Sequence, residues 1–157
     1  MKNISIVILA KNEEVLIEEC LKSVAWADEI ILVDNGSTDQ TVKLAQKYGA
    51  EVVNSSTSDF SLLRTSGMQK AHGEWILYLD ADERVTETLR KRIIEIIKNY
   101  SPASPKGYFI ARKNYYLGHL WPTRDKMHRL FWRSALKGWR GELHETAIVD
   151  GQVGDID

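Results

Sequence analysis

Short apolar runs alternate with amphipathic stretches along the first 100 residues. The apolar runs are rich in β-branched residues, which is typical of strands buried on both faces, and they occupy 4–10, 29–34, 50–54 and 75–79. Between the runs the hydrophobic spacing predicts helices over 13–24, 36–49, 60–72 and 86–100. Strands that alternate with helices predict βαβ units, and therefore a Rossmann-like α/β fold with a mixed, mostly parallel sheet and helices on both faces.

Residues at the ends of the predicted helices carry start and stop signals. Ser37 and Gln40 have the spacing of a capping box, and Gly49 is typical of a helix stop. Thr86 is the expected N-cap of the last of these helices. Cys20 falls on the apolar face of the helix predicted over 13–24, so we expect a small buried core residue.

The pattern changes after the proline-containing segment "SPASPKG" at 101–107. The segments "YFIARKNYYLG" (108–118) and "MHRLFWR" (127–133) predict strands without long helices between them, and 146–157 predicts a strand, a turn and a further strand. We therefore expect one domain over 1–157, with 1–100 and 107–157 as its two halves. Because no closing helix follows, two hypotheses stay open for its C-terminus: a complete domain, or a catalytic core truncated from a longer protein.

Composition narrows the class of protein. The chain has 157 residues, 43% hydrophobic and 27% charged, with a formal net charge of -1. That is ordinary for a soluble globular domain, and no basic field argues for nucleic acid. A single cysteine cannot form an internal disulfide, which favours a reducing compartment and a cytoplasmic location.

Polar side chains follow three of the predicted strands. Asn12 and Glu13 follow the first strand, Asp34 ends the second, and Asp80 and Asp82 follow the fourth. Because the carboxyl ends of parallel strands form the ligand-binding edge of such a sheet, we expect these groups to converge.

The Asp80-x-Asp82 pair suggests a divalent cation. If the chain is extended there, both carboxylates point the same way and repel each other, and a cation would remove that repulsion. Oxygen ligands favour Mg²⁺ or Mn²⁺, which commonly bridge to substrate phosphates. The alternative is an acidic cluster that complements the dipole of the following helix.

Other candidates also have structural alternatives. Asp34 either forms a turn with Asn35 and Gly36 or accepts hydrogen bonds from a base or ribose. Arg64 either forms a surface ion pair or holds a phosphate or base. Glu13 could act only as a partner for a helix dipole.

Three segments together resemble the nucleotide-binding half of a family-2 glycosyltransferase of the GT-A fold. These are "ISIVILAKNEEVLIEECLKSV", "EIILVDNGSTDQT" and "LLRTSGMQKAHGEWILYLDADE", and the resemblance covers residues 4 to about 90. The later "HRLFWR" and "WRGELHE" are similar to segments of a subgroup that includes lipopolysaccharide-core β-glucosyltransferases. This resemblance implies a role in the synthesis of cell-envelope polysaccharide.

The resemblance implies a role for each matching residue. Asp34 would accept from the uracil edge, Arg64 would stand near the base and phosphates, and Asp80 would touch the ribose. Asp82 of the DXD motif would hold the metal, with Asp80 beside it. The nucleotide pocket would be lined by Ala10, Asn12 and Glu13.

The sequence also departs from the family pattern. Lys11 stands where the family often has an aromatic residue, Thr65 replaces the usual asparagine, and Leu9 replaces a common proline. These differences bear on which nucleobase is bound more than on which reaction is catalysed.

An inverting transfer needs a base that deprotonates the acceptor hydroxyl. The usual Glu-Asp pair of the family is absent beyond residue 100. The segment "GELHET" supplies Glu145, favoured by its position in the similar subgroup, and then Glu142. His144 could be a further metal ligand or could orient a carboxylate. Exposed acids on an edge strand are the structural alternative.

The second half supplies candidates for acceptor binding. Aromatic rings stack on the apolar faces of sugars, and we expect one or two, such as Trp121 or Trp139, to face the substrate. Arg129, Arg133 and Arg140 could hold acceptor phosphates or be solvated.

The expected function is the transfer of a sugar, assisted by Mn²⁺ or Mg²⁺, from a nucleotide diphosphate to a glycan or lipid-linked acceptor. We expect the donor to be a UDP-sugar and the location to be cytoplasmic, with peripheral contact at the inner membrane face. A non-catalytic nucleotide-sugar-binding fragment is the alternative, and a metal-dependent phosphatase or nucleotidyltransferase is a third hypothesis.

Overall fold

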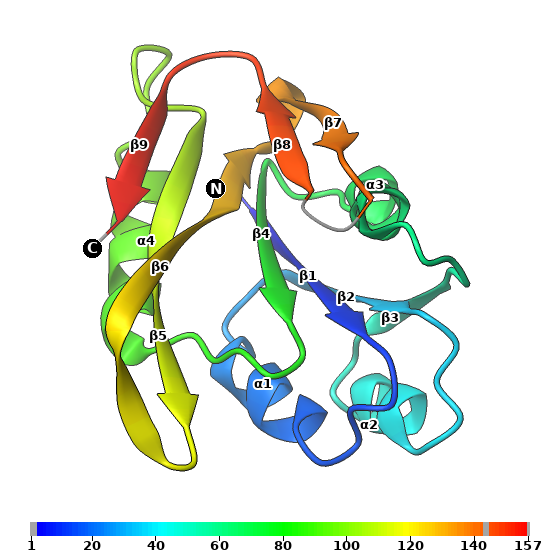
Figure 1. Cartoon of the computed structure of the whole chain (residues 1–157). Coiled ribbons are helices and arrows are strands. Elements are labelled where there is room, and N and C mark those ends of the chain that lie inside the picture. The colour runs from blue at the N-terminus through cyan, green and yellow to red at the C-terminus, as the bar shows by residue number, and fades with distance from the viewer. Residues whose placement is uncertain (1–2, 143–144, 157) are drawn as a thin grey trace.

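A computed structural model describes residues 3–142 and 145–156 (Figure 1). Its central sheet has seven strands in the order β3-β2-β1-β4-β6-β5-β9, and a separate two-stranded sheet pairs β7 with β8. The first four strands are parallel to one another, β6 runs antiparallel to β4 and β5, and β9 is parallel to β5. The predicted mixed, mostly parallel sheet is confirmed.

The elements follow the sequence pattern closely in the first half. The strands are β1 (Ile4–Ala10), β2 (Glu29–Asp34), β3 (Glu51–Asn54) and β4 (Trp75–Asp80). The helices are α1 (Ile17–Ser23), α2 (Thr41–Lys47), α3 (Phe60–Lys70) and α4 (Glu87–Lys98). Every residue of β1 is buried, as expected for a strand covered on both faces.

The second half consists mainly of strands. They are β5 (Gly107–Tyr116), β6 (His119–Trp132), β7 (Leu136–Arg140), β8 (Thr146–Val149) and β9 (Val153–Ile156). A 3₁₀ turn at Arg133–Ala135 separates β6 from β7. The strand, turn and strand predicted near the end of the chain are confirmed, but β8 and β9 join different sheets.

Two apolar cores lie on the two faces of the central sheet. On one face, Ile6 and Ile8 of β1 share a core with Ile17 of α1, Ala45 of α2 and Ile93 of α4. On the other, the alternate β1 residues Val7 and Leu9 pack with Leu63 of α3 and Leu136 of β7. Since successive residues of a strand point to opposite faces, β1 contributes to both cores.

Helix α3 approaches the sheet closely because Gly67 lies inside it. A Cβ atom at this position would lie 2.3 Å from Val7 Cγ1. A glycine within a helix normally costs stability. Here it lets the backbone of α3 contact β1, which places the neighbouring Arg64 against the sheet.

Two local predictions at helix starts are wrong. The first helix begins at Ile17 rather than 13, because residues 14–16 form a turn in which Glu13 O accepts from Leu16 N and Ile17 N. The capping box of Ser37 and Gln40 does not form, since α2 starts at Thr41 and Gln40 supplies no side-chain cap. The prediction of Thr86 as N-cap of α4 is confirmed, because its side chain accepts from Leu89 N.

Among the helices in the described part of the chain, none combines the length and apolar character needed to cross a lipid bilayer.

Candidate active site

The polar groups that follow the first, second and fourth strands meet at one edge of the sheet. Strand register places Ala10 beside Asp34 and Leu9 beside Asp80. The Ala81 amide also donates to Leu9 O at 3.2 Å. The convergence expected from the sequence is therefore present at the carboxyl ends of β2, β1 and β4.

Asp34 is buried at this edge, with 4% of its surface exposed. Its carboxylate accepts from Gly36 N at 3.2 Å and from Ser37 N at 3.1 Å. Gly36 has a positive φ of 79°, which lets the loop fold back over the carboxylate. Asp34 therefore forms the turn considered in the sequence analysis. This does not conflict with a hydrogen bond to a base or ribose, because a carboxylate in a turn still has lone pairs for a ligand.

The loops after β1 and β2 bind each other through side chains. Asn12 has a φ of 56°. Its side-chain Oδ1 accepts from Thr38 N at 2.8 Å, and its backbone N–H donates to Ser37 Oγ at 2.9 Å. The Glu13 amide donates to Thr41 Oγ1 at 2.8 Å. Ser37 and Thr41, the first residue of α2, therefore hold the segment that follows β1 in place.

Asp80 and Asp82 do not share one extended strand. Residues 81 and 82 form a turn in which the Glu83 amide donates to Asp80 O at 2.9 Å. The condition that the chain is extended from Asp80 to Asp82 is therefore not met, since the strand ends at Asp80. Asp82 is exposed, whereas Asp80 is half-buried beneath two arginines.

Arg64 and Arg129 both contact the Asp80 carboxylate. Arg129 Nη2 lies 2.6 Å from Asp80 Oδ2, and Arg64 Nη2 lies 3.3 Å from Oδ1. Burial alone would raise the pKa of Asp80, but the charges of Arg129 and Arg64 outweigh it and lower this pKa. Asp80 is thus an ionised anchor for two buried arginines.

Arg64 also bonds the residue favoured as the base. Its Nε lies 2.6 Å from Glu145 Oε1, and its guanidinium carbon lies 5.1 Å from the centroid of the Trp139 ring. Only 3% of the Arg64 surface is exposed. The surface ion pair considered for Arg64 is therefore wrong, because its guanidinium is buried where α3 meets β4 and the residue before β8.

The sequence left two alternatives for Arg129, a solvated residue or one that holds acceptor phosphates, and the solvated alternative is wrong. The structure buries it and places Nη2 3.1 Å from Glu83 Oε1, in addition to Asp80. A basic residue inside the apolar run "MHRLFWR" was the available signal, because a buried guanidinium needs acidic partners. Its partner Glu83 lies in the acidic segment that follows β4, and no local pattern pairs it with Arg129.

Glu13 lies close to other carboxylates. Burial, then the charges of Asp82 and Asp39, raise the pKa of Glu13. Within the described ranges, no three His, Cys, Asp or Glu side chains are grouped as a set of metal ligands. His144 lies outside the described residues. Asp82 is thus the exposed carboxylate of the DXD pair.

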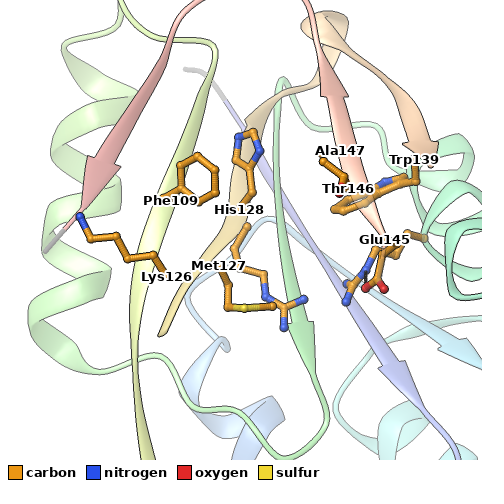
Figure 2. A pocket seen from close by; sticks show the side chains of 10 residues that line it. Phe109, Lys126, Met127, His128, Trp139, Glu145, Thr146 and Ala147 are labelled. Carbon is orange, nitrogen blue, oxygen red and sulfur yellow. Dashed lines mark hydrogen bonds and ion pairs between the residues drawn. The ribbon is translucent and has the colours of Figure 1, made fainter. Parts of the chain in front are cut away.

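A cavity of about 190 Å³ lies beside the Arg64–Glu145 pair, between β5–β6 and β7–β8 (Figure 2). Phe109 and His128 form one side, with ring centroids 4.5 Å apart, and Trp139 and Glu145 form the other. Of the two tryptophans expected near substrate, Trp139 lines this cavity and Trp121 does not.

Glu142 does not line the cavity. Its side chain is exposed, and its carbonyl accepts from Phe60 N at 2.9 Å, at the start of α3.

Two buried arginine nitrogens near the cavity, Arg64 Nη1 and Arg129 Nε, have no hydrogen-bond partner among the described residues. Buried donors without partners are uncommon in proteins, and a bound ligand could satisfy them.

A comparison with protein-family models finds that the family described as "Glycosyl transferase family 2" matches residues 5–146. The chain belongs to glycosyl transferase family 2. The match includes the strand ends at Ala10, Asp34 and Asp80 and extends to Glu145 and Thr146. The family resemblance inferred from the sequence is confirmed.

Relatives and solved structures agree with this family. An uncharacterised glycosyltransferase of Rickettsia typhi is 33% identical over 83% of this chain and 43% of its own length. The lipopolysaccharide core biosynthesis glycosyltransferase LpsC of Rhizobium meliloti is 27% identical over 97% and 59%, respectively. This family-2 chain therefore spans about half the length of these curated relatives.

Solved structures share the fold. S. aureus TarS 1-349 in complex with UDP-GlcNAc is 25% identical, with a TM-score of 0.60, over 77% of this chain and 37% of that one. Glucosyl-3-phosphoglycerate synthase from Mycobacterium tuberculosis, in complex with UDP, is 22% identical with a TM-score of 0.60. It covers 73% of this chain and 46% of its own, and shows the likeness of fold alone.

Proposed function

We propose that this family-2 chain carries the catalytic domain of an inverting glycosyltransferase that uses a UDP-sugar. The proposal depends above all on one observation, the meeting of Ala10, Asp34 and Asp80 at the carboxyl ends of three adjacent parallel strands. Ligands bind at that edge in open α/β sheets. The TarS structure with UDP-GlcNAc supports a UDP-sugar as the donor.

In this proposal the nucleotide lies across the loops after β1 and β2. Asp34 accepts a hydrogen bond from the uracil edge, while Ala10, Asn12 and Glu13 line the pocket. The Asn12–Thr38 bond keeps the two loops together and so preorganises the pocket. Asp80 lies toward the ribose, and Arg64 lies near the phosphates.

Asp82 fits a divalent metal better than Asp80 does. Its carboxylate is exposed, while the two oxygens of Asp80 accept from Arg64 and Arg129. Mg²⁺ and Mn²⁺ sites often use one or two protein carboxylates and complete their ligands with substrate phosphates. Bound Mn²⁺ or Mg²⁺ would neutralise charge on the leaving diphosphate. Asp80 and His144 remain the other candidate ligands.

Glu145 is the proposed base for the acceptor hydroxyl. It lies on the wall of the cavity, and Arg64 fixes the orientation of its carboxylate. The acceptor oxygen would lose its proton to Glu145 as it attacks the anomeric carbon, opposite the leaving diphosphate. Glu142 is the second candidate for this role.

The proposed acceptor is a glycan or a lipid-linked saccharide. The named relative LpsC supports a role in the synthesis of cell-envelope polysaccharide. We place this activity in the cytoplasm, at the inner face of the membrane.

A thermal-shift panel tests the proposal. UDP together with Mn²⁺ should raise the melting temperature, since a ligand that binds only the folded state stabilises it by about 2.7 kcal/mol at 100 times its Kd. Mn²⁺ alone and UDP alone are the controls. An unchanged melting curve across UDP, GDP, CDP and TDP with Mn²⁺ would contradict the proposal.

A further inference from the structure

The outer part of the β5–β6 hairpin is a ribbon that extends away from the sheet (Figure 1). Residues 111–116 of β5 pair only with residues 119–126 of β6, among the described strands. The pairing of β5 with β9 ends at Ile110, and that of β6 with β4 begins at Leu130. No third described strand pairs with this segment, residues 111–126, and an isolated two-stranded ribbon is at best marginally stable in water.

The tip of this ribbon is apolar and exposed. Every residue from 115 to 122 is exposed. Leu117 reaches 83%, and the tip also exposes Tyr115 (68%), Tyr116 (64%), Leu120 (52%) and Trp121 (50%). A group of large exposed apolar side chains marks an interaction site.

Leu117 lies at the turn in an unfavourable backbone conformation. Its φ is 50° and that of Gly118 is 79°, the geometry of a two-residue hairpin turn in which both central residues have positive φ. Asn or Gly would adopt this conformation with less strain. The sequence thus has a leucine where turn geometry favours a polar residue.

The apolar side chains lie on both faces of the ribbon. Tyr115 is opposite Leu120, and Tyr116 is opposite His119. Trp121 lies on the His119 face and contacts Tyr116, with ring centroids 6.0 Å apart. A flat protein interface would cover one face, whereas this tip suits a medium that surrounds it.

Charge behind the tip favours an anionic surface. Residues 111–126 contain four basic residues against the single carboxylate of Asp125, a formal charge of +3 in a chain whose net charge is -1. Arg112 and Lys126, at the base, contact carboxylates, while Lys113 is exposed one step nearer the tip. Lys113 and Leu117 are four residues apart, roughly 13 Å along a strand. This spacing puts a cation at headgroup level when the tip enters the interface.

We propose that residues 115–121 insert into the interface of an anionic lipid bilayer. Tyr and Trp are enriched at that level of a membrane, and the two leucines provide apolar area below it. This inference deepens the proposed function, because Lys126 at the base of the ribbon and Phe109, two residues before it, line the cavity beside Glu145. A bound ribbon would thus bring the cavity to a membrane-borne acceptor.

Co-sedimentation with vesicles tests this without donor, metal or acceptor. The chain should pellet with phosphatidylcholine vesicles that contain phosphatidylglycerol, and less with phosphatidylcholine alone. Leu117→Asn should lower the partition coefficient by about tenfold, since it removes apolar area from the tip. Its melting temperature should stay constant or rise, because Asn tolerates a positive φ. A structural role of Leu117 would predict the opposite.

Leu62→Asn and Leu120→Asn form a matched pair, because these leucines are 53% and 52% exposed and only Leu120 lies on the ribbon. Only the ribbon variant should lose binding. Absence of sedimentation with both kinds of vesicle would overturn the inference, as would equal losses in this pair. If the wild type is a dimer and Leu120→Asn is a monomer, the partner of the ribbon is a second copy of this chain, which would overturn the inference. Loss of the UDP and Mn²⁺ thermal shift, with vesicle binding intact, would contradict only the proposed function.

Discussion

Arg64 Nε lies 2.6 Å from Glu145 Oε1, although 81 positions separate the two residues in the chain. The same guanidinium contacts Asp80, which also bonds Arg129. This network connects the proposed base to the strand end where the nucleotide is expected. The buried arginines thus have two roles, in stability and in the geometry of the site.

Replacement of Arg64 should destabilise the fold strongly. Arg64→Ala leaves Asp80 and Glu145 without this partner, and removal of one member of a buried pair typically costs about 3–5 kcal/mol. Arg92→Ala is the control, because its pair with Glu95 on α4 is exposed and should be worth under about 0.5 kcal/mol. Urea unfolding of both variants measures the difference. Similar losses would mean that the Arg64 pairs contribute no more than a surface pair does.

The two carboxylates of the DXD pair should respond differently to substitution. Asp82→Asn should leave the melting temperature of the free protein unchanged, since Asp82 is exposed, and should abolish the rise caused by UDP with Mn²⁺. Asp80→Asn should lower the melting temperature of the free protein, because it removes the charge that Arg64 and Arg129 share. Thermal shift with and without ligand separates these effects. A full ligand response in Asp82→Asn would exclude Asp82 as the metal ligand.

The proposed base predicts a large loss of rate at Glu145. Glu145→Gln should slow transfer about 10²–10⁴-fold, the usual contribution of a general base. Transfer of labelled sugar from UDP-GlcNAc or UDP-glucose to a bacterial membrane extract measures it. UDP binding by the variant should persist, which distinguishes lost chemistry from lost folding. If Glu142→Gln loses the activity and Glu145→Gln retains it, the base is Glu142.

Stability should fall with acid partly because of His128. Burial lowers the pKa of this histidine to about 4 from an ordinary value near 6.5. Between these values the unfolded chain binds a proton that the folded chain does not, so stability is lost as the pH falls from about 6.5 to about 4. Unfolding of His128→Gln across this range should show a smaller dependence on pH. His119→Gln, on the exposed ribbon, should behave as wild type.

The contact between α3 and β1 should not tolerate a side chain at position 67. Gly67→Ala places its Cβ atom 2.3 Å from Val7 Cγ1, and overpacking of this kind typically costs about 1–3 kcal/mol. Gln69→Ala on the same helix is exposed and should be neutral or stabilising. Chemical denaturation compares the two. A Gly67→Ala variant as stable as wild type would mean that the helix shifts without cost.

The sequence by itself determined the parallel half of the fold. The runs at 4–10 and 29–34 match β1 and β2 residue for residue, because a strand covered on both faces needs mostly apolar side chains. The meeting of the residues that follow these strands was also predictable, since parallel topology brings strand ends together at one edge of the sheet.

Only the tertiary structure decided how the charged side chains are paired. From the sequence, Arg64 was a candidate for a surface pair, because its position in a polar helix does not show whether its side chain is buried. Gly67, three residues further on, lets this helix approach the sheet and so buries Arg64. Glu145 meets Arg64 through a long-range contact that no local pattern encodes. Local spacing fixes strands and helices, but the partner of a buried charge depends on which distant segments pack together.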